Sequence, residues 1–178
     1  MTDQSPNSPL DKALKQLTYG FYIVATRKEG SDLKTRSEDW VSASTVSWAT
    51  QSSFDPPLIT IAIQKDSDVN ETIQKAQSFS LTVLGKDDEE LIKKFAKQTD
   101  VDYGAHSVNG ISYTEGETGA PVLDCGVATL ECKLEDALTT HGDHILFVGK
   151  VIKATSKDGQ PITELDTRKH YEGVSPRS

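Results

Sequence analysis

Six short runs rich in β-branched and aromatic residues, separated by polar or glycine-containing segments, dominate this chain. They lie at residues 19–26, 40–48, 58–63, 79–84, 127–135 and 144–154. Runs of this length and composition are typical of β-strands. Because they rarely alternate with long helical patterns, a doubly wound parallel sheet is disfavoured, and a mainly β barrel with a few short helices is predicted.

Three stretches have helical features. Pro9–Leu17 has Ser8 as a candidate N-cap and a proline at its first position. Ser67–Ala76 can be capped by its own first residue or by Asp66. Asp87–Lys97 is acidic at its start and carries lysines near its end, a polarity that complements the helix dipole.

Further local patterns predict burial and loops. Leu58–Ile63 is nearly continuous in apolar residues, which predicts a strand buried on both faces. Residues 98–126 have no sustained period and are predicted to form a long loop, and Arg27–Asp39 is predicted to be an exposed loop between two strands. Gly149, inside the last run, indicates a β-bulge.

Length and charge restrict the organisation and the partners. The 178 residues are predicted to form one domain at 10–157, with a flexible arm at 1–9 and a polar tail at 158–178. A net charge of −8 makes nucleic acid or an anionic membrane an unfavourable partner. No apolar stretch approaches the ~20 residues of a membrane span, and no apolar signal region begins the chain, so a cytoplasmic location is expected.

Cysteine usage agrees with that location. Cys125 and Cys132 are seven residues apart, which is not a metal-ligand spacing, and two cysteines do not make a disulfide framework. Both lie in or next to an alternating apolar run. We therefore predict buried, reduced thiols, as is usual in the cytosol.

The residues from Ser42 to Pro57 are the strongest pointer to function. This segment is rich in small hydroxyl side chains, ends in two prolines and runs directly into an apolar strand. Small polar side chains allow a flat, polar ligand to approach the backbone closely. Lys65 and Ser67 follow just before a predicted helix, and a lysine beside a helix N-terminus suits a phosphate group. Together these features predict a site for a phosphorylated, planar cofactor.

The site is not one of the common nucleotide motifs, because the chain lacks a Gly-x-Gly-x-x-Gly sequence and a Gly-Lys-Ser/Thr phosphate loop. Instead, five blocks in order resemble the flavin reductase-like family, whose fold is the Greek-key, FMN-binding split β-barrel. The blocks are Gly20–Thr26, Thr45–Pro57, Lys65–Ser67 with Phe79–Leu84, Leu91–Ala96, and His141–His144 with Phe147–Val151. Each block is weak alone, but their order over residues 19–153 makes the match specific. Ser47–Gln51 and Thr167–Tyr171 are most similar to the flavin reductase domains fused to flavodiiron proteins of photosynthetic bacteria.

The resemblance implies a homodimer that binds one FMN per subunit near the dimer interface, with FAD as an alternative flavin. It implies reduction of flavin by NADH or NADPH, and transfer of electrons to free flavin, a flavin-dependent oxygenase, another redox protein or oxygen. The residues implied to line the flavin ring are Thr45, Val46, Ser47 and Trp48, those implied to face the ribityl chain and phosphate are Thr50, Gln51, Lys65 and Ser67, and His144 is implied to lie where nicotinamide stacks.

Two residues depart from the family pattern. The family often has a second serine where Trp48 stands, and an asparagine where Thr82 stands. A tryptophan at position 48 could stack near the flavin ring or narrow the nicotinamide slot, although tryptophan more often lies in a core.

Plainer roles and other functions remain open from the sequence. His144 could be a strand-edge histidine bonded to Asp143, Lys65 a solvated lysine, and Ser47 and Thr50 simple sheet hydroxyls. Two other functions also fit the pattern. One is an electron carrier that holds FMN but is reduced by a small redox protein. The other is a non-catalytic barrel that senses a planar ligand.

Overall fold

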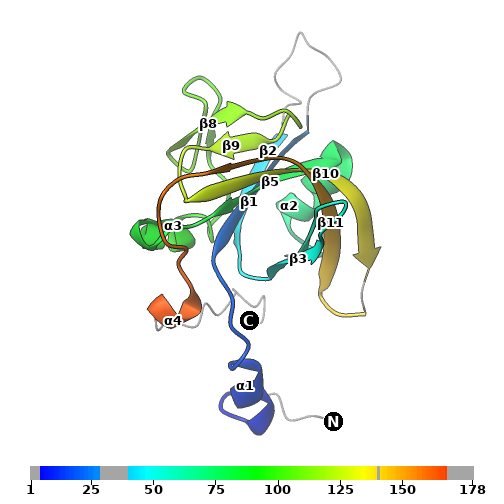
Figure 1. Ribbon diagram of the computed structural model, residues 1–178, viewed down its shortest axis with the longest axis vertical. Coiled ribbons are helices and arrows are strands. Elements are labelled where there is room, and N and C mark those ends of the chain that lie inside the picture. Colours follow the sequence, from blue (N-terminus) through cyan, green and yellow to red (C-terminus); the bar gives the residue numbers. More distant parts are fainter. Residues whose placement is uncertain (1–4, 29–39, 140, 168–178) are drawn as a thin grey trace.

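A single seven-stranded antiparallel sheet forms the body of the protein. The computed structural model describes residues 5–28, 40–139 and 141–167. The sheet has the order β2-β1-β5-β10-β11-β4-β3 (Figure 1). Its strands are β1 (Tyr22–Lys28), β2 (Trp40–Val46), β3 (Ala49–Ser53), β4 (Leu58–Gln64), β5 (Ser78–Val83), β10 (Ala128–Thr139) and β11 (His144–Ser156).

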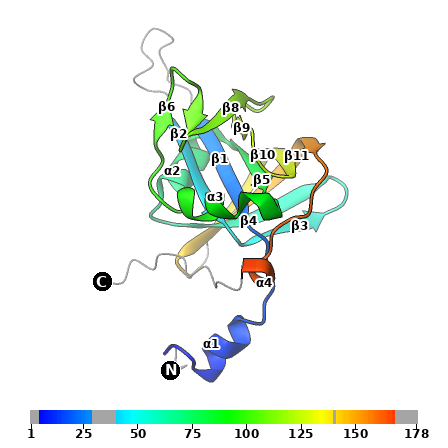
Figure 2. The same cartoon turned by 90° about the vertical axis from the view of Figure 1, so that its left-hand side faces the viewer.

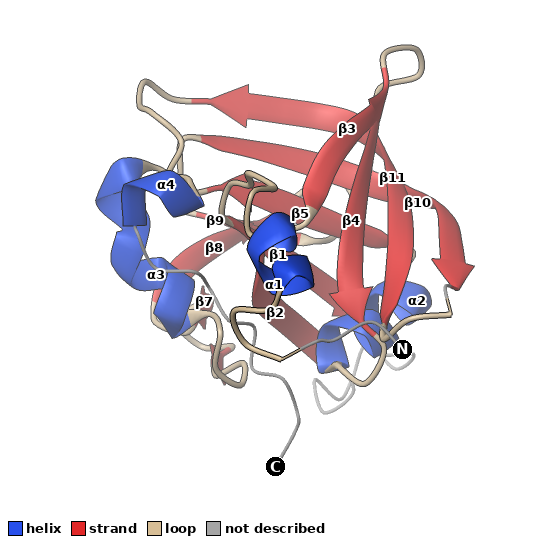
Figure 3. Cartoon of the chain, turned by 90° about the horizontal axis from the view of Figure 1, so that it is seen from below, coloured by secondary structure: helices blue, strands red, loops and turns tan. Residues whose placement is uncertain are grey.

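The two edge strands of this sheet, β2 and β3, are consecutive in the chain. β2 ends where Val46 pairs with Tyr22 of β1, and β3 begins where Ala49 pairs with Ile61 of β4. Ser47 and Trp48 alone cross from one edge to the other. The sheet therefore curls into a barrel that is split along this line, as the view from below shows (Figure 3). The predicted mainly β split barrel is confirmed, although the sequence did not indicate that β3 is a separate strand.

The helices are short, and the first of them projects away from the barrel (Figure 1). They are α1 (Pro9–Leu14), α2 (Asp68–Ala76), the 3-10 turn η2 (Lys86–Asp88), α3 (Glu89–Lys94) and α4 (Glu164–Thr167). Both predicted serine caps are confirmed, since the Ser8 hydroxyl accepts from the amide of Asp11 and that of Ser67 from the amide of Asn70, each at 3.2 Å. The helices predicted at 9–17 and 87–97 are shorter than expected. No helix in the described ranges has the length and apolarity to cross a membrane.

The prediction of a structureless loop at 98–126 is wrong. This region forms a second, four-stranded sheet, made of β6 (Val101–Asp102), β7 (Ser107–Val108), β8 (Ile111–Glu115) and β9 (Pro121–Leu123). Asn109 and Gly110 turn the chain between β7 and β8, and both have positive φ angles (48° and 73°). A two-residue Asn-Gly turn of this kind is a strong hairpin signal. The sequence pattern does not reveal this hairpin, because β7 and β8 are too short to show a clear alternation of apolar and polar residues.

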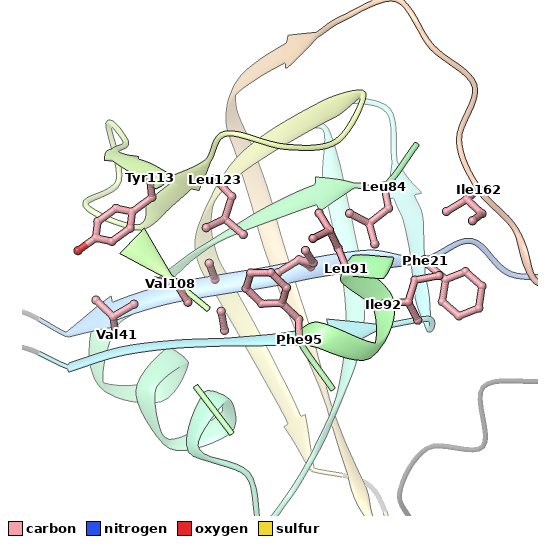
Figure 4. Packing of buried hydrophobic residues seen from close by; sticks show 13 residues of the cluster. Phe21, Val41, Leu84, Leu91, Ile92, Phe95, Val108, Tyr113, Leu123 and Ile162 are labelled. Carbon is pink, nitrogen blue, oxygen red and sulfur yellow. The ribbon is translucent and has the colours of Figure 1, made fainter. Parts of the chain in front are cut away.

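Two hydrophobic cores lie on opposite faces of the sheet. One, in the barrel interior, combines α2 with β4, β5 and β11, and includes Ile61, Ile73, Phe79 and Phe147. The other lies between β1, β2 and β5 on one side and α3 and the small sheet on the other (Figure 4). Figure 2 shows α3 lying across β1 and β2.

Two predictions about strands need correction. Leu58–Ile63 is not buried on both faces, because buried residues alternate with half-buried ones along β4. Gly149 is not itself a bulge, since the register shift lies opposite it, between Leu134 and Asp136 of β10. A Cβ at position 149 would lie 2.5 Å from Cζ of Phe79, so glycine is needed there to admit the phenyl ring.

Residues 160–164 return to the barrel. Ile162 is buried in the second core, and the Glu164 carboxylate accepts a 2.8 Å hydrogen bond from the amide of Tyr19. These contacts show that residues 162–164 pack on the domain, while the boundaries proposed at 9 and 157 stay predictions. The Thr167–Tyr171 match and most of the predicted loop at 27–39 lie outside the described residues.

Both cysteines are free thiols, Cys132 being buried and Cys125 half-buried. Burial raises the pKa of each thiol to about 12, because a thiolate is poorly solvated there. Since the thiolate is the reactive form, we expect neither to react appreciably with a disulfide reagent such as DTNB at pH 7.5 in the folded protein. Both should react after unfolding in guanidinium. Rapid modification of a thiol in the folded state would contradict this assignment.

Candidate functional site

The predicted site residues lie on three segments that meet beside the split in the barrel. These are the β2–β3 crossing, the link from β4 to α2, and the start of β11. β4 and β11 are paired, with His144 opposite Gln64, so the end of one strand and the start of the other lie together near α2 (Figure 3). Residues that are up to 99 positions apart in the chain, from Thr45 to His144, are thereby placed around one edge of the fold.

Lys65 is held by its backbone on both sides. Its amide donates a 2.9 Å hydrogen bond to the carbonyl of Asp143. Its carbonyl accepts from the side-chain amide of Asn70, which is buried in the first turn of α2. The base of Lys65 is therefore fixed next to the N-terminus of α2 and to the turn before β11.

The start of α2 offers donors for an anion. The amide of Asn70 is taken by the Ser67 cap, whereas the amides of Asp68 and Val69 donate to no group in the described part of the chain. Helix N-termini carry a partial positive charge and attract anions. The exposed carboxylates of Asp66 and Asp68 oppose this attraction, so a phosphate here would depend on the cation of Lys65.

The hydroxyl of Ser67 already has two partners. It accepts from the Asn70 amide and donates to the carbonyl of Gln64 at 2.8 Å. A hydroxyl has one proton, so a direct bond to phosphate would require it to leave Gln64. The direct contact of Ser67 with a cofactor stays a prediction, and the structure gives this residue a second role as the helix cap.

His144 is held between a carboxylate and an indole. Its Nδ1 lies 2.7 Å from Oδ1 of Asp143. Because a carboxylate can only accept, Nδ1 carries the proton and Nε2 is the acceptor in the neutral ring. The ring of Trp48 lies with its centroid 4.8 Å from that of the imidazole, at an interplanar angle of 50°. These three side chains bring the β2–β3 crossing to the start of β11.

Thr45 and Val46 turn their side chains away from this edge. The Thr45 hydroxyl donates to the carbonyl of Ile92 at 2.8 Å, its amide donates to the carbonyl of Phe95, and both residues are buried. Only backbone groups of these two residues can face a ligand. Ser47 is different, because neither its hydroxyl nor its amide donates a hydrogen bond within the described residues.

Thr50 and Gln51 are exposed on the edge strand β3. Their side chains bond locally, Thr50 to the carbonyl of Gln51 and Gln51 to the carbonyl of Ser53. An edge strand leaves one side unpaired, so both residues are accessible for binding. Nothing in these local bonds directs them towards Lys65.

The bond from His144 to Asp143 is one of the alternatives that the sequence left open, but the contact of Asp143 with Lys65 and the role of Asn70 were missed. Asp143 contacts two predicted site residues, His144 through its carboxylate and Lys65 through its carbonyl. Asn70 stands three residues after the Ser67 cap, and this position in the first turn was the available signal. Thr82 lies elsewhere, in β5 between Ile23 and Thr129, where its buried hydroxyl has no partner among the described groups.

A cavity of about 270 Å³ lies away from these residues. It is lined by residues 112–114 of β8, residues 122–129, and Thr155 and Lys157. None of the predicted site residues lines it. The candidate site therefore lies outside this cavity.

Comparison with known sequences identifies the class of protein. The family described as "Flavin reductase like domain" matches residues 14–175. The chain belongs to this family. A diflavin flavoprotein A 1 of Synechocystis sp. is 28% identical over 167 residues, which cover 93% of this chain and 27% of that protein. A high molecular weight rubredoxin of Moorella thermoacetica is 31% identical over 170 residues, covering 94% and 69%.

Solved structures of flavin reductase-like proteins have the same fold. An NADH:FAD oxidoreductase of Streptomyces globisporus superposes with a TM-score of 0.67 at 26% identity, covering 89% of this chain and 90% of that one. An FMN-binding protein of Thermus thermophilus gives 0.68 at 25% identity, covering 88% and 82%. The chain spans about a quarter of the length of the diflavin flavoproteins, between 22% and 28%. Membership of the family supports flavin reduction, and hence an oxidoreductase, as the class of activity.

Proposed function

We propose that this protein is a flavin reductase that binds FMN and takes hydride from NADH or NADPH. One observation supports the proposal beyond family membership, namely that the turn into β11 contacts both Lys65 and Trp48. The Asp143 carbonyl accepts from the Lys65 amide at 2.9 Å, and the His144 ring lies with its centroid 4.8 Å from that of the tilted Trp48 indole. A candidate phosphate group and a candidate ring group therefore share one edge. FMN has the two matching parts, a terminal phosphate and a flat ring.

The phosphate end fits the start of α2. The cation of Lys65 and the amides of Asp68 and Val69 would hold it, with Asn70 keeping the Lys65 backbone in place. The bound flavin would supply the hydride-accepting chemistry, while the protein supplies position and electrostatics. FAD also carries a phosphate at this point of its chain, and one neighbouring structure is named for FAD, so FAD is the alternative flavin.

The ring end fits the β2–β3 crossing. The amide and hydroxyl of Ser47 are available donors for the polar edge of a flavin, and backbone groups of Thr45 and Val46 adjoin them. Thr50 and Gln51 would lie along the ribityl chain. Hydrogen bonds from fixed backbone groups orient a flat ring without the entropic cost of ordering long side chains.

His144 would position the nicotinamide. With Nδ1 bonded to Asp143, the Nε2 lone pair can accept from the carboxamide N–H of the donor. This role needs no proton transfer by His144, and hydride transfer requires no general acid. His144 would thus act by orientation rather than by acid–base chemistry.

Assembly and partners are part of the same proposal. Phe54, at the end of β3, is 91% exposed, and β3 is an unpaired edge, so this side is suited to cover by a second copy of the chain. We propose a cytoplasmic homodimer with flavin and nicotinamide nucleotides as ligands. Its reduced flavin would transfer electrons to free flavin, to a flavin-dependent oxygenase or to another redox protein.

Anaerobic titration tests this function. We expect the purified protein to be yellow, or to become so with FMN, and the flavin absorbance near ~450 nm to bleach on addition of NADH or NADPH. A yellow protein that is bleached by neither NADH nor NADPH would favour the electron carrier. Similarity to a protein named high molecular weight rubredoxin is the observation in favour of this second function. A protein that takes up no flavin would overturn both flavin hypotheses and leave the sensor of another planar ligand.

A further inference from the structure

Trp48 occupies an unusual position for a tryptophan. Trp48 is 56% exposed as a whole residue, yet its indole lies against the imidazole of His144, a side chain that is only 20% exposed. The backbone beneath it is fixed, because the Trp48 carbonyl accepts a 3.0 Å hydrogen bond from the amide of Ala62 in β4. The indole is therefore a ring on a rigid base, with His144 as its aromatic partner.

We propose that Trp48 is a specificity-determining gate, whose indole covers the face of His144 and must move aside before a nicotinamide ring can enter. This inference rests on the proposed function, because it concerns the nicotinamide end of the same site. The indole is a planar aromatic ring of the kind that the subsite is proposed to accept. It acts as an internal competitor for the imidazole.

The contact between Trp48 and His144 gives the direction of the effect. An incoming nicotinamide ring must displace the indole of Trp48 from His144. The apparent affinity for the nicotinamide is therefore the affinity of the open subsite multiplied by the fraction of molecules in which the indole has moved aside. Aromatic pairs typically hold together with a strength equivalent to about two- to tenfold in an equilibrium constant. Lys65 is a separate point of attachment for FMN, so the protein can be loaded with saturating FMN and the gate measured through the nicotinamide concentration dependence.

The decisive variant is Trp48→Ser, with Trp40→Ser as its matched control. Trp40 is also exposed, but it stands at the other end of β2 beside Lys75. In rapid anaerobic bleaching of the FMN-loaded protein, we expect Trp48→Ser to lower the half-saturating NADH or NADPH concentration about two- to tenfold. Each variant is measured at saturating FMN, and the half-saturating nicotinamide concentration is compared with the limiting rate, because a gate acts on the first of these quantities. Trp40→Ser should change none of these values.

A spectroscopic measurement tests the contact itself. In a Trp40→Phe background, Trp48 is the remaining tryptophan of the chain, since there are two. We expect His144→Ala to increase quenching of its fluorescence by acrylamide, because the indole loses the ring that shields one face. Unchanged quenching would overturn the stack.

The other outcomes separate this inference from the proposed function. A wild-type protein that binds FMN but is not bleached by NADH or NADPH would contradict both the reductase function and the gate. If the wild-type protein is bleached but Trp48→Ser has an unchanged or raised half-saturating NADH or NADPH concentration, the gate alone is contradicted. Loss of FMN binding in Trp48→Ser would also overturn it, because Trp48 would then be a flavin platform.

Discussion

We expect Lys65→Ala to weaken FMN binding by about 10- to 100-fold while changing riboflavin binding less than about threefold. The two ligands share the ring and the ribityl chain and differ in the phosphate. Lys65 stands three residues before Asp68, the first residue of α2, and Asp66 and Asp68 add negative charge beside it. Without Lys65 the dianionic phosphate would face carboxylates with only the helix terminus in its favour. Fluorescence titration of the flavin measures both affinities.

Two controls make this prediction specific. Lys93→Ala removes an exposed lysine from α3 and should leave FMN affinity unchanged. Raising the salt concentration should weaken FMN binding to the wild-type protein more than to Lys65→Ala, because screening acts on the charge pair. An equal loss of FMN and riboflavin affinity would exclude a phosphate role for Lys65.

The largest effect on stability is expected from Phe79→Ala, at about 3–5 kcal/mol in the free energy of unfolding. Phe79 is fully buried in the barrel interior, opposite Cys132 and against Gly149. Glycine at 149 has no side chain that could fill the space left by the ring. Removal of the phenyl group therefore leaves a cavity that the strands cannot readily close. Since domains are typically stable by only about 5–15 kcal/mol, the variant should unfold at much lower denaturant concentration.

Phe54→Ala is the matched control for this change. Phe54 is 91% exposed in the single chain, so at a protein concentration that keeps the chain monomeric the same substitution should change the unfolding free energy by less than about 0.5 kcal/mol. Phe79→Leu keeps much of the volume and should cost less than the alanine variant, which preserves the test if Phe79→Ala does not fold. A Phe79→Ala midpoint equal to that of Phe54→Ala would show that the barrel interior is not the stabilising core. Denaturation followed by circular dichroism measures all three.

The stability of this core bears on the site because the same strands serve both. β11 begins with His144 and continues through Phe147 to Gly149, and β4 carries Ile61 and Ile63 just before Lys65. The buried residues of each strand fix the position of the candidate site residue at its end. Substitutions in the core are thus expected to lower activity mainly through the folded fraction.

The local chemistry of short sequence segments was sufficient to predict the helix caps and most of the strands. Ser8 and Ser67 cap their helices because a serine hydroxyl satisfies an amide of the first turn whatever surrounds it. The strand runs were evident because β-branched and aromatic residues report directly on an extended, half-buried backbone. The order of the motifs also determined the family, since that information is linear.

Tertiary structure alone decided how the site is assembled. The break between β2 and β3 was invisible because Ser47 and Trp48 have the same composition as the strands on either side, and only the pairing partners, Tyr22 and Ile61, separate them. Likewise, the contact of Trp48 with His144, and the links from Asp143 to Lys65 and from Thr45 to α3, depend on which strands pair. Strand pairing is a non-local choice, set by the burial of two cores on opposite faces of one sheet. No short stretch of sequence contains that energy balance, so candidate site residues can be named one by one from the sequence, but their contacts with one another cannot.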